Sequence, residues 1–172
     1  MASSRELSEE QRVQLEHLLI RHSDAFAKSK NDLGCCDLIE HTIDTGDARP
    51  VKQNLRRLPL AKGAAADQEI NRMLERGIVE PSTSPWSSPI VLVPKKSDGS
   101  WRFCADFRKI NHLTKKDSYP LPRIADCLDA LRGASWYSTI DLQSGYWQVK
   151  MAESDKEKTS IVTTKGLFQF KV

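Results

Sequence analysis

The chain has 172 residues, of which 39% are hydrophobic and 28% are charged, and its formal net charge is +3 at pH 7. This composition suits one ordinary globular domain and excludes a mainly disordered chain. No run of about 18 apolar residues is present, and the first residues lack the apolar core of a signal peptide. We therefore expect an intracellular, cytoplasmic protein without a signal or transmembrane segment.

The positive charge is concentrated in the later part of the chain. Residues 1–50 carry 6 Lys and Arg against 10 Asp and Glu, whereas residues 51–172 carry 20 against 13. The densest basic stretch, residues 90–116, holds 7 Lys and Arg against 2 Asp. A solvated surface and a polyanion partner both explain such a stretch. The four cysteines and four histidines show neither a Cys-x-x-Cys pair nor metal-ligand spacing, so reduced thiols are expected.

The first half of the chain predicts two helices joined by extended segments. The first helix begins at Ser8, with Gln11 three residues later as its capping-box partner, and its leucines form one packing face. A polar linker, a short strand near residue 41 and an extended segment follow. Apolar residues at helical spacing predict the second helix over residues 59–77, and prolines keep residues 78–89 extended.

A basic hairpin is predicted next. Residues 90–94 form an apolar strand, residues 97–100 a turn, and residues 101–107 the returning strand. Because side chains alternate along a strand, several polar residues share one face of this ribbon. They are Arg102, Cys104, Asp106 and Arg108, with Lys95 and Lys96 across the turn.

The last part of the chain predicts a short helix and a hairpin that carries a carboxylate. Residues 123–132 form the helix, with its apolar side chains directed inward, and residues 136–142 form a strand that ends at Asp141. Residues 143–145 supply a turn before a second strand, and residues 159–163 and 168–172 form two more. Taken alone, Asp141 could be an ordinary surface aspartate at the mouth of a hairpin. The whole pattern predicts an α+β fold with a ligand between hairpin and sheet.

Five segments of the chain resemble the reverse transcriptases of gypsy-type long-terminal-repeat retrotransposons and their retroviral relatives. They are residues 82–93, 95–104, 106–111, 116–124 and the string Asp-Leu-Gln-Ser-Gly-Tyr-Trp-Gln-Val at residues 141–149. Residues 41–51 are similar to the lead-in of the same polymerases, which argues against the aspartic protease loop that Asp44-Thr45-Gly46 also matches. The resemblance covers about residues 41–172 and implies a right-hand polymerase fold.

The resemblance implies three parts of the chain. Residues 1–40 would be an N-terminal helix and linker, residues 41–80 an extended lead-in arm and helix, and residues 81–172 the fingers and a partial palm. The palm sheet would be incomplete, so the strand with Phe168 and Phe170 would lack neighbours. We therefore expect exposed apolar surface and marginal stability.

The resemblance also implies template-directed nucleotidyl transfer assisted by two Mg²⁺ ions. Asp141 would be the first of three catalytic aspartates and would bind both ions, with the Leu142 carbonyl as a further ligand. Arg108 would contact the template strand. The residues implied to bind the incoming dNTP are Lys95, Arg102, Ser144, Gly145 and Tyr146. The implied partners are an RNA or DNA template with primer, dNTP, and the remainder of a Pol polyprotein, including the rest of the palm, the thumb and RNase H; no membrane is implied.

The departures from the family concern the catalytic centre. The Tyr-x-Asp-Asp string that supplies the other two aspartates does not occur in the sequence, and neither does Met-Pro-Phe-Gly. Since Mg²⁺ gives up its water reluctantly, one aspartate is too few for two ions. We expect this chain alone to be inactive. The alternative function is a non-catalytic nucleic-acid-binding remnant of a decayed retroelement.

Overall fold

The structure is a computed structural model that describes residues 7–29, 32–96 and 99–172. Its helices are α1 (Glu9–Arg21), α2 (Leu60–Glu75), α3 (Arg108–Leu113) and α4 (Ile124–Ala130). Its strands are β1 (Cys36–His41), β2 (Val79–Pro81), β3 (Ser88–Pro94), β4 (Trp101–Ala105), β5 (Val149–Met151), β6 (Ile161–Thr163) and β7 (Gly166–Phe170). Among the described residues, no helix has both the length and the apolar character needed to cross a membrane.

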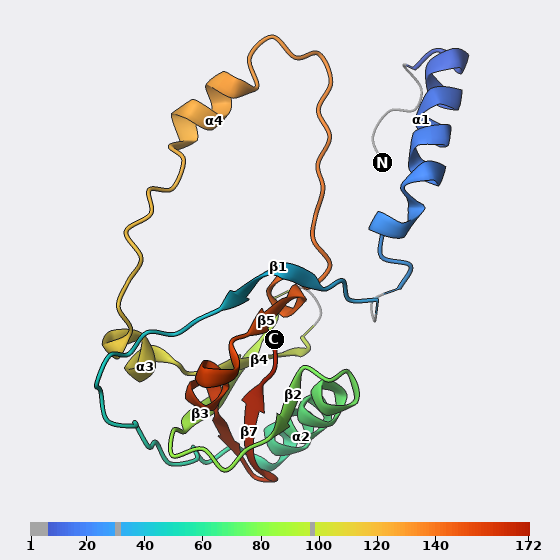
Figure 1. The fold of residues 1–172 in the computed structure, drawn as a ribbon. Coiled ribbons are helices and arrows are strands. Elements are labelled where there is room, and N and C mark those ends of the chain that lie inside the picture. The colour runs from blue at the N-terminus through green and yellow to red at the C-terminus, as the bar shows by residue number, and fades with distance from the viewer. Residues whose placement is uncertain (1–6, 30–31, 97–98) are drawn as a thin grey trace.

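A five-stranded mixed sheet forms the body of the molecule. Its strand order is β2-β7-β6-β3-β4, with β3 parallel to β6 and the other neighbours antiparallel (Figure 1). The predicted hairpin is confirmed where β3 and β4 pair, from Ile90 with Ala105 to Pro94 with Trp101. The predicted extension of its polar face to Asp106 and Arg108 is wrong, because β4 ends at Ala105 and Arg108 begins α3. Strands β1 and β5 form a separate parallel pair. Since β7 lies between β2 and β6, the expectation that its neighbours are absent is wrong.

Helix α2 packs on this sheet through the apolar positions that predicted it. Ile70 is 0% exposed, and Ala66 and Met73 are also buried. The helix ends before Gly77, whose φ of +66° favours glycine. Sheet residues complete the core: Ile78, Val79, Ile90, Leu92, Ile161 and Phe168. The core therefore combines residues from β2 and β3 with residues from β6 and β7 near the end of the chain.

Helix α1 begins as predicted but packs on nothing in the described structure. Ser8 accepts a hydrogen bond from the Gln11 backbone N–H, and the Gln11 side chain accepts one from the Ser8 N–H. The predicted packing face is exposed, with Leu18 at 51%. The helix lies beyond β1, away from the sheet (Figure 1), so no described element covers its leucines.

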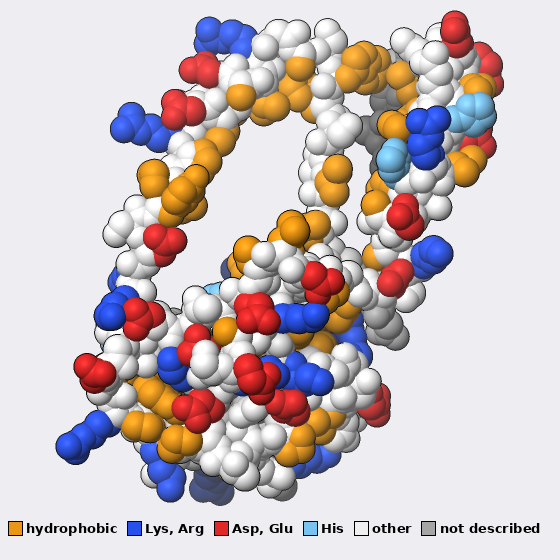
Figure 2. Space-filling view, viewed as in Figure 1, with side chains coloured by type: hydrophobic (Ala, Val, Ile, Leu, Met, Phe, Trp, Pro, Cys, Tyr) orange, Lys and Arg blue, Asp and Glu red, His pale blue; other side chains and the backbone are white. Residues whose placement is uncertain are grey.

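Residues 115–144, called the α4 loop below, leave the body after α3 and return at β5 (Figure 1). Helix α4 forms as predicted, but its apolar side chains are exposed rather than directed inward: Ile124 is 79% exposed and Leu128 is 63% exposed. Hydrophobic side chains lie along this loop in Figure 2. The predicted exposed apolar surface is therefore present, on the α4 loop and α1 rather than on β7.

Two isoleucines on different helices allow the core to be tested. Ile70→Ala should lower the free energy of unfolding by about 3 kcal/mol, because it opens a cavity between α2 and the sheet. Ile124→Ala on α4 should change it by less than about 0.5 kcal/mol, because that side chain is already in solvent. Chemical denaturation of the two variants measures both values. Equal losses would show that α4 is packed in solution.

Candidate functional site

Asp141 lies on the returning limb of the α4 loop and is exposed to solvent. The predicted strand over residues 136–142 is wrong: this segment has no strand pairing in the described structure. A strand requires a hydrogen-bonded neighbour, and the described edge strands β2 and β4 do not pair with it. Ile140 and Leu142 are accordingly 80% and 67% exposed. The segment is therefore rich in residues that favour β-strands, but no described strand pairs with it.

The predicted turn after Asp141 is present and is tightly wound. Ser144 has a φ of +51°, in the left-handed region, and a 3-10 helix follows over Gly145–Gln148. The Ser144 carbonyl accepts a hydrogen bond from the Trp147 N–H at 2.8 Å. A Cβ on Gly145 would lie 3.1 Å from the Leu142 Cβ, so a side chain at this position would require Leu142 to shift by a few tenths of an ångström. Ser144, Gly145 and Tyr146 therefore all lie in this turn, and the Tyr146 side chain is 96% exposed.

Lys95 and Arg102 lie at the end of the β3–β4 hairpin, and both are exposed. Arg102 pairs with Val93, and Lys95 follows two residues later, so strand alternation directs the two cations to the same face. The Lys95 N–H donates to the Ser100 carbonyl at 2.7 Å, while residues 97 and 98 of the predicted turn lie outside the described residues. The Lys62 ammonium of α2 lies 4.7 Å from the centre of the Trp101 ring, a cation–π contact between α2 and the hairpin.

Arg108 begins α3 and is held by a carboxylate. Its Nε and Nη2 donate to Oδ1 and Oδ2 of Asp106, both at 2.8 Å. Arg56 Nη2 donates to the same Oδ2 at 2.5 Å. The Arg108 guanidinium, through these hydrogen bonds, holds the pKa of Asp106 well below its usual range, against the opposing effect of burial.

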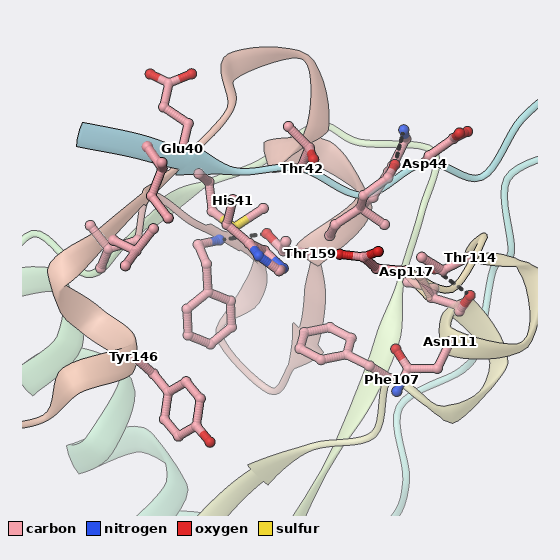
Figure 3. Close-up of a pocket in the computed structure, with 18 of the residues that line it drawn as sticks. Glu40, His41, Thr42, Asp44, Phe107, Asn111, Thr114, Asp117, Tyr146 and Thr159 are labelled. Carbon is pink, nitrogen blue, oxygen red and sulfur yellow. Dashed lines mark hydrogen bonds between the residues drawn. The ribbon is translucent and has the colours of Figure 1, made fainter. Parts of the chain in front are cut away.

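A cavity of about 880 Å³ lies between the β1 segment, α3 and the turn at Tyr146 (Figure 3). Its apolar lining includes Phe107, Ile110, Met151, Phe170 and Val172. Its charged and polar lining includes Glu40, His41, Asp44, Lys115, Asp117 and Lys158. Of the expected site residues, Gly145 and Tyr146 line this cavity, whereas Lys95, Arg102, Arg108, Asp141, Leu142 and Ser144 are not among its lining residues.

Asp155 and Lys158 fix the chain that forms one wall of this cavity. Asp155 Oδ2 accepts a hydrogen bond from the Ile43 N–H at 2.9 Å, and Lys158 Nζ donates to the Ile43 carbonyl at 2.7 Å. The same ammonium donates to Asp155 Oδ1 at 2.7 Å. The carboxyl and ammonium side chains are only 11% and 17% exposed. This ion pair therefore replaces water for both backbone groups of Ile43.

The Asp44 carboxylate is also occupied by its neighbours. It accepts a hydrogen bond from the Gly46 N–H at 2.8 Å and pairs with Lys115 Nζ at 3.0 Å. The Gly46 N–H first, and Lys115 second, lower the pKa of this carboxyl. The Asp-Thr-Gly tripeptide thus forms a local turn that holds the start of the α4 loop.

The metal ligands implied by the resemblance are Asp141 and the Leu142 carbonyl. In the part of the chain that the structure describes, no three His, Cys, Asp or Glu side chains gather closely enough to hold a metal ion. Asp141 is exposed on a segment without strand neighbours. A single carboxylate of this kind does not meet the requirements of two Mg²⁺ ions.

Comparison with known proteins identifies the fold and the family. The family described as reverse transcriptase (RNA-dependent DNA polymerase) matches residues 93–172. The Pol polyprotein of transposon 412 from Drosophila melanogaster is 34% identical over 162 residues, which are 91% of this chain and 13% of the relative. The chain belongs to the reverse transcriptase family. The Pol polyprotein of Drosophila transposon gypsy is 36% identical over 88% of this chain and 15% of its own length.

Solved reverse transcriptases share the fold of this family member. The native protease-reverse transcriptase of prototype foamy virus gives a TM-score of 0.81 at 23% identity, over 96% of this chain and 22% of that one. The foamy viral enzyme in complex with RNA/DNA hybrid gives 0.76 at 21% identity, with the same coverage. These likenesses confirm the predicted incomplete α+β polymerase fold. The chain spans about one seventh of the length of its first curated relatives.

Sequence patterns did not reveal two features of this reverse transcriptase segment. Asp155 and Lys158 have the spacing of a helical ion pair, which could have indicated their contact but not their hold on Ile43. Arg56 and Asp106 are 50 residues apart, and no local pattern connects them. Both contacts join the lead-in arm to later parts of the chain.

Asp155 makes stability depend on pH. Burial would raise the pKa of this carboxyl, but the hydrogen bonds from Lys158 and the Ile43 N–H outweigh burial and lower it. A lowered pKa in the folded state adds stability above the unfolded value of about 3.9, and this stability is lost as the pH falls through the folded value. Asp155→Asn should therefore cost about 2 kcal/mol at pH 7 and progressively less on acidification.

Denaturant titrations of wild type and Asp155→Asn between neutral and acid pH measure this difference. The matched control is Glu153→Gln, since Glu153 is 85% exposed and pairs with Lys156 in the same turn. It should change stability by less than about 0.5 kcal/mol. A gap between Asp155→Asn and wild type that stays constant down to the lowest pH would contradict the role of the ionised carboxylate.

Proposed function

We propose that this chain is the fingers and the first part of the palm of an RNA-directed DNA polymerase from a gypsy-type retrotransposon Pol polyprotein. The observation that carries the proposal is the family match over residues 93–172, within a fold whose β3–β4 hairpin directs two exposed cations to one face. Residues 1–40 and 41–80 would serve as the N-terminal helix with its linker and as the lead-in arm. The protein would act in the cytoplasm, within virus-like particles.

The substrates of the intact polymerase would be dNTP and an RNA or DNA template with its primer. Lys95 and Arg102 are proposed to bind the triphosphate, because two exposed cations on one hairpin face can neutralise it. The tight turn at Ser144 and Gly145 would offer backbone N–H groups to the same triphosphate. Tyr146, exposed beside them, would lie under the deoxyribose and exclude a 2′-hydroxyl.

Asp141, with the Leu142 carbonyl, is proposed as one part of a two-metal Mg²⁺ centre. Such ions activate the primer hydroxyl and stabilise the departing pyrophosphate when they are bound. The other carboxylates would come from outside this sequence, which has no Tyr-x-Asp-Asp string. The remaining palm, the thumb and RNase H of the polyprotein would be the partners that complete the enzyme.

The second candidate function is nucleic-acid binding without catalysis. It is favoured by the exposed basic residues of the hairpin and α3 together with the lack of a metal-binding cluster among the described residues. Both candidates require that the chain bind a template. They differ in whether a longer protein adds the missing carboxylates.

The chain by itself should not extend a primer. With one candidate metal-binding aspartate it should incorporate no dNTP in the presence of Mg²⁺, because two ions need more anionic ligands than Asp141 supplies. A primer-extension assay on the purified chain, with Asp141→Asn as the matched variant, measures this. Mg²⁺-dependent incorporation that Asp141→Asn abolishes would refute the expected inactivity.

Binding of a recessed template–primer should depend on Arg108. Arg108→Ala should weaken binding about tenfold and reduce the slope of log affinity against log salt by about 0.7, the value for one phosphate contact on a single strand. Fluorescence anisotropy over a range of salt concentrations measures both quantities. Arg12→Ala on α1 is the control and should leave the slope unchanged. Salt-independent binding by the wild type would count against both candidate functions.

A further inference from the structure

The Asp106 carboxylate joins two arginines that come from different parts of the chain. Arg108 follows the fingers hairpin and contributes Nε and Nη2, both at 2.8 Å. Arg56 belongs to the lead-in arm and contributes Nη2 at 2.5 Å. The carboxylate side chain is 9% exposed, whereas the side chains of Arg56 and Arg108 are 46% and 77% exposed. A nearly buried anion thus lies beneath two guanidinium groups that reach solvent.

The lead-in arm is fixed to the body close to Arg56. The Gln53 N–H donates to the Ser87 carbonyl at 3.0 Å, and the Ser87 hydroxyl donates to the Gln53 carbonyl at 2.8 Å. The Ser87 N–H donates to the Val51 carbonyl at 3.0 Å. Ser87 is buried and immediately precedes β3. The backbone at Gln53, three residues before Arg56, is therefore held in place. The Arg56 side chain then joins the lead-in arm to Asp106, the residue that follows β4.

The three side chains carry a net charge of +1. If Arg56 were neutral, the Asp106 charge would be compensated by Arg108 alone, and the remaining pair would have no net charge. A phosphate would then be attracted much less strongly to Arg108, because the nearby carboxylate would cancel its field. Because Arg56 also pairs with the Asp106 carboxylate, Asp106 can orient the Arg108 guanidinium while the three side chains together remain positively charged.

We propose that Arg56 is a positioning residue for the template strand, acting through Asp106 on Arg108. The inference rests on the proposed function, since it assumes that Arg108 contacts a template phosphate. Arg56 holds Oδ2 of Asp106, and Asp106 in turn holds the planar guanidinium of Arg108 by two hydrogen bonds. Template binding by the fingers therefore depends on a residue of the lead-in arm.

A double-mutant cycle on the full chain tests this dependence. Arg56→Ala, Arg108→Ala and the double variant are titrated with a fluorescent recessed template–primer that has a single-stranded template overhang. We expect losses of affinity of about fivefold for Arg56→Ala and about tenfold for Arg108→Ala, with the double variant also near tenfold, since coupled residues are not additive. Each should reduce the salt slope by the same amount, about 0.7.

Two further variants separate positioning from charge and from folding. Arg57→Ala removes the same charge one residue away, from an exposed side chain, and should weaken binding by less than about twofold. Arg56→Lys keeps the charge beside Asp106 and should restore affinity to within about twofold of wild type. Thermal unfolding of every variant shows whether the fold is kept, because loss of structure would lower the melting temperature.

The outcomes distinguish the inference from the proposed function. A loss of about fiftyfold in the double variant would mean that Arg56 acts independently of Arg108 and would overturn the inference. Equal losses for Arg56→Ala and Arg57→Ala, or no recovery with Arg56→Lys in a folded protein, would overturn it too. If Arg108→Ala weakens binding and Arg56→Ala does not, only the inference fails. If Arg108→Ala has no effect, the assigned template contact fails and the inference fails with it.

Discussion

Pairing on both sides of β3 is the constraint on which the rest of the structure depends. Its first residues pair with β6, and its later residues pair with β4 over five positions. The residue before it, Ser87, holds the lead-in arm at Gln53. One strand therefore connects the basic hairpin, the last strands of the chain and the lead-in arm. The hairpin that carries Lys95 and Arg102 is thereby joined to the rest of the sheet through the first residues of β3.

Local patterns predicted the elements whose stabilising contacts are near in sequence or follow a simple period. The second helix followed from apolar residues that are now buried, such as Ile70, and the hairpin followed from its turn and alternation. The strand over residues 136–142 could not be decided in this way. Its composition favours a strand, but a strand also needs a neighbour, and the described residues provide none there. The same reason explains why Ile124 and Leu18, although correctly spaced for packing, remain in solvent.

The candidate site also shows that local sequence patterns do not predict contacts between distant residues. Asp141, Ser144 and Gly145 could be selected from the sequence because they form a recognisable string with turn residues, and the turn is present. The ion pair of Arg56 with Asp106 and the hold of Asp155 on Ile43 join residues 50 and 112 positions apart. Such contacts depend on how the lead-in arm lies against later parts of the chain, which no local period encodes. The sequence therefore identified chemical groups better than it identified what orients them.

The place of β7 between β2 and β6 also has a consequence for protein synthesis. Strand β2 ends at Pro81, whereas β7 begins at Gly166. At the usual speed of translation, the ribosome needs on the order of ten seconds to make the intervening residues. During that interval β2 lacks the strand that pairs with it, and Ile161 and Phe168, which complete the core beside α2, are not yet made. A nascent chain of this kind would be a natural client for chaperones that shield apolar segments until the sheet can close.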